Sequence, residues 1–152
     1  MPAIEFPRTI PEGTLVPVYP GDPVDTGKYY EHVYDLYLME EVPVEEARSW
    51  VYAAMNEALR KLDLTLYDMG GKGARGMFCV IFYNIGPTIP KHSDLDAQFG
   101  SELSEASGYS ITGTDALFMN EWVAKKFAWW LLGIGATIAS VAIGTAAKKK
   151  KR

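Results

Sequence analysis

The spacing of hydrophobic residues predicts a long amphipathic helix between Pro43 and Leu62. Its apolar positions recur at helical intervals and form one stripe: Ala47, Val51, Ala54, Ala58 and Leu62. Proline at the first helical position and two glutamates in the first turn favour the same start, because the fixed φ and the helix dipole suit them there. We therefore expect this helix to cover one face of a sheet.

Three stretches predict the strands of that sheet. Residues 29–38 fit both a strand and a helical stripe, and their four tyrosines favour the strand, because aromatic side chains suit a pleated surface. Residues 62–67 alternate between leucine and polar residues, and residues 77–85 form a continuous apolar run typical of a central strand. The resulting order, β-α-β-β, predicts an α+β fold in which a helix packs on a mainly antiparallel sheet.

A shorter helix is predicted at 94–106, with Ser93 as its N-terminal cap and an apolar stripe of Leu95, Phe99 and Leu103. The Ser/Gly/Thr-rich residues 107–114 then predict a linker. We expect Thr114 to cap a last helix that runs without a break from Asp115 to the end of the C-terminal apolar segment.

That segment, 127–147, contains no charged residue. As a helix its 21 residues would span about 31 Å, the thickness of the hydrocarbon core of a bilayer. Aromatic and basic residues gather at its start, as at a membrane interface: Trp122, Lys125, Lys126, Trp129 and Trp130. The pattern predicts a transmembrane helix, so we expect the lipid bilayer to be a partner.

Small residues recur on one face of this predicted helix: Gly133, Thr137, Ser140 and Gly144. In lipid, such a face lets a second helix approach closely, which favours a homo-oligomer or another helical partner. The alternative is that these residues only keep the hydrophobicity of the segment low. The chain closes with five basic residues: Lys148, Lys149, Lys150, Lys151 and Arg152.

Charge and proline content complete the predicted organisation. The chain divides into a Pro-rich extended arm (1–28), an acidic α+β domain (29–112), a juxtamembrane helix (113–126), the transmembrane helix (127–147) and a basic tail (148–152). Residues 1–120 hold 8 Lys/Arg and 18 Asp/Glu, a net charge of −10, which argues against nucleic-acid binding by the body. The arm either wraps the body or docks on a neighbouring subunit.

These features predict a single-pass, C-terminally anchored protein with a structural or docking role in assembly. No secretory signal is evident, so we expect the body to stay cytosolic or to face a capsid. A basic tail on the far side favours either a mitochondrial outer-membrane-type tail anchor or a minor virion protein that links an internal membrane to a capsid. In the second case the tail would contact DNA or anionic lipid without reading sequence.

The glycine-rich stretch 70–76 carries two cations, Lys72 and Arg75, at the tip of the predicted hairpin. Glycine-rich turns can present backbone N–H groups to an anion, so the loop is a possible anion-binding site. It lacks the Gly-Lys-Ser/Thr order of a phosphate-binding loop, and a flexible hairpin turn is the simpler interpretation.

Candidate chemistry is sparse. His92, Asp94 and Asp96 resemble half of an iron site, but no second histidine follows, so we expect no metal and no cofactor. His32 lies among tyrosines and is interpreted as a structural histidine, and Cys79 as a buried thiol. No catalytic residue is identified and we do not expect an enzyme. The alternative is a membrane-tethered enzyme that uses His32, or His92 with the two aspartates.

Overall fold

The computed structural model describes residues 2–123 of the 152-residue chain. Along the chain its elements are β1 (Thr14–Pro17), β2 (Tyr29–Asp35), β3 (Tyr37–Leu38), α1 (Val44–Lys61), β4 (Leu64–Lys72), β5 (Ala74–Asn84), α2 (His92–Ser107), β6 (Ile111–Thr112) and β7 (Phe118–Val123). The predicted α+β class is confirmed for this body, which combines an antiparallel sheet with two helices.

Strand β2 lies at the centre of a five-stranded sheet in the order β1-β7-β2-β5-β4. It pairs antiparallel with β5 on one side and with β7 on the other. The predicted hairpin is formed by β4 and β5, and it turns at Gly73, whose φ of 85° lies in the left-handed region that glycine adopts without strain. Strands β3 and β6 form a separate two-stranded sheet.

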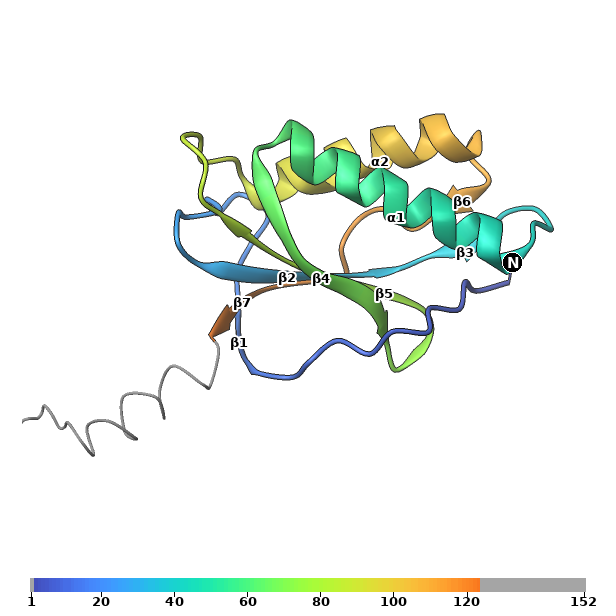
Figure 1. Cartoon of the computed structure of the whole chain (residues 1–152), viewed down its shortest axis with the longest axis horizontal. Helices are drawn as coiled ribbons and strands as arrows, with labels where there is room; N and C mark the ends of the chain where they lie inside the picture. The colour runs from blue at the N-terminus through green and yellow to red at the C-terminus, as the bar shows by residue number, and fades with distance from the viewer. Residues whose placement is uncertain (1, 124–152) are drawn as a thin grey trace, which may run out of the picture. The chain divides into compact units, whose positions relative to one another are not determined.

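Both helices cover the same face of this sheet (Figure 1). Helix α1 buries four of the five residues of the predicted stripe, together with two neighbours of the stripe: Ala47, Val51, Ala54 and Ala58, with Met55 and Leu59. The fifth, Leu62, is the C-cap of the helix and is only partly buried. Helix α2 begins two residues earlier than predicted, because the N-cap is Lys91 rather than Ser93. The Asp94 carboxylate accepts a hydrogen bond from the Lys91 N–H at 2.9 Å and so closes the first turn.

The proline-rich arm passes around the β4 edge of the sheet and crosses its other face to reach β1 at the opposite edge (Figure 1). Two glycines in β4 allow the backbones to approach closely. A Cβ on Gly71 would stand 2.5 Å from the Phe6 carbonyl oxygen, and one on Gly70 would stand 2.4 Å from the Cβ of Arg8. The arm buries Ile4 and Ile10, so in this structure it packs on its own body.

The predicted juxtamembrane helix 113–126 is wrong where the structure describes it. Residues 111–112 form β6 and residues 118–123 form β7. The residues of β7 show no alternation of apolar and polar positions, and the pairing decides its structure: β2 offers a hydrogen-bonding edge that β7 completes as an antiparallel strand. Trp122 was assigned to a membrane interface; instead it is buried and packs against Tyr29 and Tyr67.

The prediction of a transmembrane protein is also corrected. Across residues 2–123 no helix combines the length and the apolar character that a bilayer crossing requires. The predicted span 127–147 lies outside the described residues, as do Lys125, Lys126, the small-residue face and the basic tail. The membrane and virion interpretations therefore have no support in the part of the chain that the structure describes.

Candidate functional site

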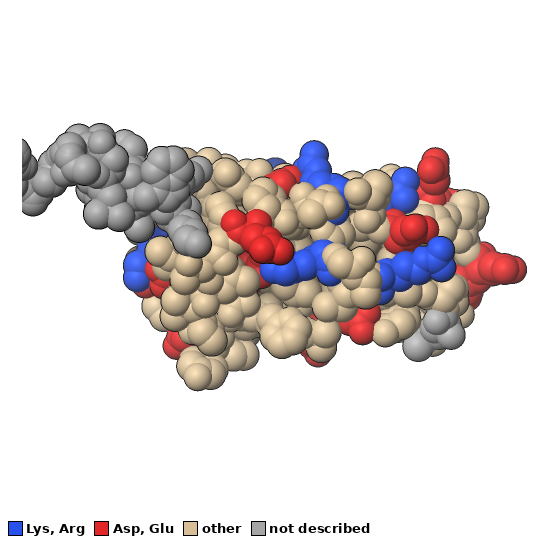
Figure 2. Space-filling model, turned by 90° about the horizontal axis from the view of Figure 1, so that it is seen from below, with Lys and Arg blue, Asp and Glu red and all other residues tan. Residues whose placement is uncertain are grey.

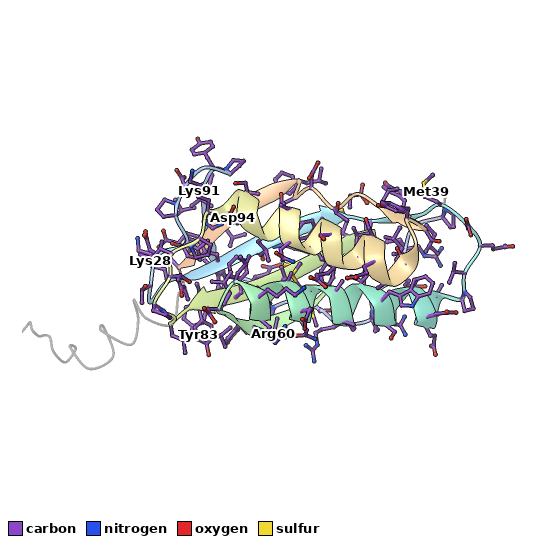
Figure 3. All side chains as sticks on the ribbon, turned by 90° about the horizontal axis from the view of Figure 1, so that it is seen from above. Lys28, Met39, Arg60, Tyr83, Lys91 and Asp94 are labelled. Atoms are coloured by element: carbon purple, nitrogen blue, oxygen red, sulfur yellow. The ribbon has the colours of Figure 1, made fainter. Side chains whose placement is uncertain are left out.

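Two histidines that are 60 residues apart in sequence meet between β2 and the start of α2. His32 Nε2 and His92 Nδ1 are 2.9 Å apart, and both side chains are fully buried. Aromatic rings surround them: Tyr30 stands edge-on to His92, and Phe82 stands edge-on to His32. Figure 3 shows the end of the molecule where α2 begins, marked by Lys91 and Asp94.

A chain of hydrogen bonds links this pair to a carboxylate. The Tyr34 hydroxyl donates to Asp96 Oδ1 at 2.8 Å, so its oxygen is free to accept from His32 Nδ1 at 3.1 Å. With His32 protonated on Nδ1, His32 Nε2 accepts, and His92 Nδ1 must be the donor of the bond between the two rings. Asp96 Oδ2 accepts from the backbone N–H of Ala116 at 3.0 Å. The network thus selects one tautomer for each histidine.

One atom of the network is left without a partner. His92 Nε2 is buried and forms no hydrogen bond with any described residue. With His92 protonated on Nδ1, the Nε2 atom carries a lone pair, so adding a proton to Nε2 would create a buried donor. Burial, and then the neighbouring His32, lower the pKa of His92 to about 4. Burial and the adjacent Asp96 raise the pKa of Tyr34 well above its ordinary value, so its hydroxyl remains a donor.

The structure therefore brings together three of the four residues considered for chemistry, and separates the fourth. His32, His92 and Asp96 share the network, whereas Asp94 closes the first turn of α2. Within residues 2–123 no group of three His, Cys, Asp or Glu side chains is placed to hold a metal ion. Sequence reasoning missed Tyr34, although its place two residues after His32 on one strand face was the available signal.

The two cations of the glycine-rich loop are each paired with a carboxylate. Lys72 Nζ lies 2.9 and 3.0 Å from the oxygens of Glu31, which is only 1% exposed. Arg75 lies 3.5 Å from Glu5 of the arm at an exposed position. The proposed anion-binding loop therefore uses its charges to join β4 to β2 and β5 to the arm.

Cys79 is fully buried on β5. Burial, reinforced by the charge of Glu31, raises the pKa of its thiol far above the ordinary value. The thiolate is the reactive form of cysteine, so this side chain is chemically inert in the folded protein.

An open hollow of about 550 Å³ lies beside the network. Its lining comes from the loop after β1, the first turns of α2, the loop between β6 and β7, and β7 itself. The lining residues are Val18, Tyr19, Pro20, Ser93, Asp96, Ala97, Asp115, Ala116, Leu117 and Met119. Two carboxylates and no Lys or Arg are among these side chains. Among the side chains of the buried network, Asp96 alone lines the hollow, so the network ends at the surface there.

Large apolar side chains are exposed along the β1–β7 edge next to this hollow. Val16, Tyr19, Leu117 and Phe118 are between 47% and 68% exposed. A second hollow, of about 310 Å³, lies between Leu15, Met77 and Phe118. It is on the sheet face that the helices leave uncovered and the arm crosses, which we call the open face. Figure 2 shows this face: charged side chains gather over its middle and one end, while the end near β1 and β7 is mostly uncharged. We call these four exposed residues (Val16, Tyr19, Leu117 and Phe118) the apolar edge.

Comparisons with protein-family models, with curated proteins and with solved structures give no match.

Proposed function

We propose that this protein is a non-catalytic docking module that binds a partner protein through the apolar edge. The observation that carries this proposal is the concentration of exposed apolar side chains at one end of the sheet, beside two hollows. Contiguous exposed apolar residues bordered by polar ones are characteristic of protein-binding surfaces. Strand β1 also ends the sheet there, so its outer backbone groups can accept a further strand.

The placement of the reactive residues supports binding over catalysis. A general base or a nucleophile has to come within hydrogen-bond reach of its substrate. His32, His92 and Cys79 are fully buried and packed among core side chains, so a substrate cannot reach them in this conformation. Asp96 reaches the hollow, but both of its oxygens already accept hydrogen bonds from within the protein.

Charge indicates the chemistry of the partner. Residues 1–120 carry a net charge of −10, and the hollow beside the apolar edge presents Asp96 and Asp115. Asp115 has no hydrogen bond or ion pair with the part of the chain that is described. We propose a protein surface that presents apolar side chains next to lysine or arginine, because opposite charges raise the association rate and exclude like-charged competitors.

Site-specific photo-crosslinking in the native host tests this function. A photoreactive phenylalanine analogue at position 118 should yield one discrete heterologous adduct at neutral pH. The same analogue at Tyr109, which is 76% exposed after α2, serves as the matched control and should yield none. The adduct should disappear in the Leu117→Asp variant, since a charge would disrupt the apolar contact.

Two outcomes would overturn the proposal. Equal labelling from positions 118 and 109 would show that the apolar edge has no preferred partner. An adduct with twice the mass of the chain would show that the apolar edge binds a second copy of this protein rather than a different partner.

A further inference from the structure

The His32–His92 pair holds a surface loop as well as the core. Residues 18–25 are attached to the start of α2 by three backbone hydrogen bonds. The N–H groups of Val24, His92 and Ser93 pair with the carbonyl oxygens of Pro90, Asp22 and Pro20 at 2.8, 3.1 and 2.8 Å. This loop carries Tyr19 of the apolar edge and forms one wall of the larger hollow. Whatever loosens His92 therefore also loosens part of the proposed docking site.

The pair has no place for an additional proton. A proton on His92 Nε2 becomes a buried donor with no acceptor among the described residues. A proton on His32 Nε2 instead places two N–H groups against each other at 2.9 Å. Relieving that clash means moving the His92 proton from Nδ1 to Nε2, which again leaves Nε2 as a buried donor without a partner. Each arrangement leaves an unsatisfied buried N–H, which is costly.

The surrounding charges do not remove this conflict. The ionisable groups around the pair come from three elements: Tyr30 and Tyr34 of β2, Asp22 of the loop, and Asp96 of α2, with Asp25, Asp115 and Glu121 beyond the two tyrosines. Strand β5 contributes the neutral Phe82, and the β7 residue paired with His32 is Met119. Asp22 and Asp96 attract a proton to His92, but neither accepts one from Nε2. A cation at the first position of α2 also opposes the positive end of the helix dipole.

We propose that protonation of the His32–His92 pair releases the start of α2 together with the loop that carries Tyr19, so that acidification disrupts the docking site. This inference rests on the proposed function, whose regulation it describes. At neutral pH His92 is uncharged, and its contacts keep the hollow in shape. Under acidic conditions the imidazoles reach water only when the first turn of α2 and residues 18–25 move away from the sheet.

Hydrogen exchange of the full-length protein, corrected for the intrinsic rate at each pH, tests the release. The opening equilibrium of residues 18–25 and 91–96 should rise about tenfold between pH 7.5 and pH 5.5, because the open state binds the proton that the closed state excludes. The middle of α1 is the internal control and should keep its protection. The His92→Gln variant should lose the pH response, because glutamine can donate to His32 Nε2 but does not titrate.

Imidazole nitrogen NMR of the wild-type protein gives a second measurement that does not depend on a variant folding. At pH 7.5 His92 should be neutral and protonated on Nδ1, and it should gain its proton together with the opening. A charged His92 at pH 7.5, protection that does not change with pH, or an unchanged pH response in His92→Gln would each overturn the proposal.

The exchange and NMR measurements use the free protein, so they succeed or fail independently of the crosslink at position 118. Release without any crosslink at neutral pH would refute the docking function alone. Repeating the crosslink at pH 5.5 tests whether the release of the loop controls docking, and the adduct should then be lost. An adduct that persists while residues 18–25 open would show that the apolar edge works without this loop, and would overturn the regulatory step.

Discussion

The two faces of the central sheet bury polar groups in opposite ways. On the helix-covered face, β2 contributes Tyr30, His32 and Tyr34, and their polar atoms meet other protein atoms in a network that reaches the surface only at Asp96. On the face crossed by the arm, the same strand contributes Tyr29, Glu31 and Val33, and Glu31 is neutralised by a lysine that is itself partly exposed. One strand thus takes part in a hydrogen-bonded network on one side and in an ion pair on the other.

The difference follows from what covers each face. Two helices exclude water, so polar groups on the helix-covered face have to find their hydrogen bonds within the protein, and the Asp96 carboxylate stands where the network reaches the surface. The arm covers less of the open face, so a charge can remain there if its partner reaches solvent. Residues available to a partner are accordingly expected on the open face and at its apolar edge.

The largest expected contrast is between two phenylalanines. Phe99 of α2 is fully buried and packs against Tyr34 and Phe78, with ring centroids 4.9 and 6.1 Å away. Phe99→Ala should lower the free energy of unfolding by about 3–5 kcal/mol, because it removes a buried ring and leaves a cavity. Phe118→Ala, at a position that is 56% exposed, should cost less than about 0.5 kcal/mol. Urea denaturation of both variants measures the contrast, and similar losses would contradict it.

The next largest expected effect is a loss of stability at low pH, which arises from His92 on the helix-covered face. The pKa of His92 is about 4 in the folded protein, below its ordinary value of 6.5. The unfolded chain therefore binds more protons between these values, and stability falls as the pH drops from about 6.5 to about 4. The loss should approach about 3 kcal/mol.

Because carboxylates also titrate near pH 4, the informative quantity is the difference between wild type and His92→Gln in the free energy of unfolding. Urea titrations at pH 7.5, 5.5 and 4.5 should show this difference shifting against the wild type as pH falls. A constant difference would mean that His92 contributes nothing to acid sensitivity.

On the open face the ion pair provides the test. Lys72→Met leaves the buried Glu31 without its partner and should cost about 1–3 kcal/mol, less than for a fully enclosed pair because the Lys72 side chain is 35% exposed. Arg75→Met, in the same hairpin, removes only the exposed pair with Glu5 and should cost about 0–0.5 kcal/mol. Thermal unfolding of the two variants separates them, and equal shifts would show that Glu31 is readily hydrated.

The smallest effect tests the arm. A Cβ on Gly13 would stand 2.0 Å from Nε1 of Trp122, so Gly13→Ala should push the arm or the indole aside at a cost of about 1–2 kcal/mol. Gly21→Ala meets no atom within 4 Å and serves as the control. Limited proteolysis should cut the arm faster in Gly13→Ala only. Equal cutting rates would show that the arm does not need this close approach.

Local patterns were sufficient for much of the fold. The stripe of α1 and the hairpin of β4 and β5 follow from side-chain periodicity, which records which face of each element is buried. The same logic failed at β7. Its six residues place the apolar pairs Phe118–Met119 and Trp122–Val123 around Asn120 and Glu121, so they show no strand period, and the uncharged segment that follows them suggested one continuous helix. Only the free edge of β2 decides for a strand.

The α+β fold class, the acidic charge of the body and the lack of a recognisable catalytic motif could all be predicted from the sequence. Charge and motifs are read directly from the residues, and periodicity depends only on residues close together in the chain. Only the tertiary structure decided that His32 and His92 form a pair, that Tyr34 joins them to Asp96, and that Lys72 serves Glu31 rather than an anion. Those contacts join residues 41 to 62 positions apart. Strand register and helix packing bring them together, and neither can be read from the spacing of any one segment.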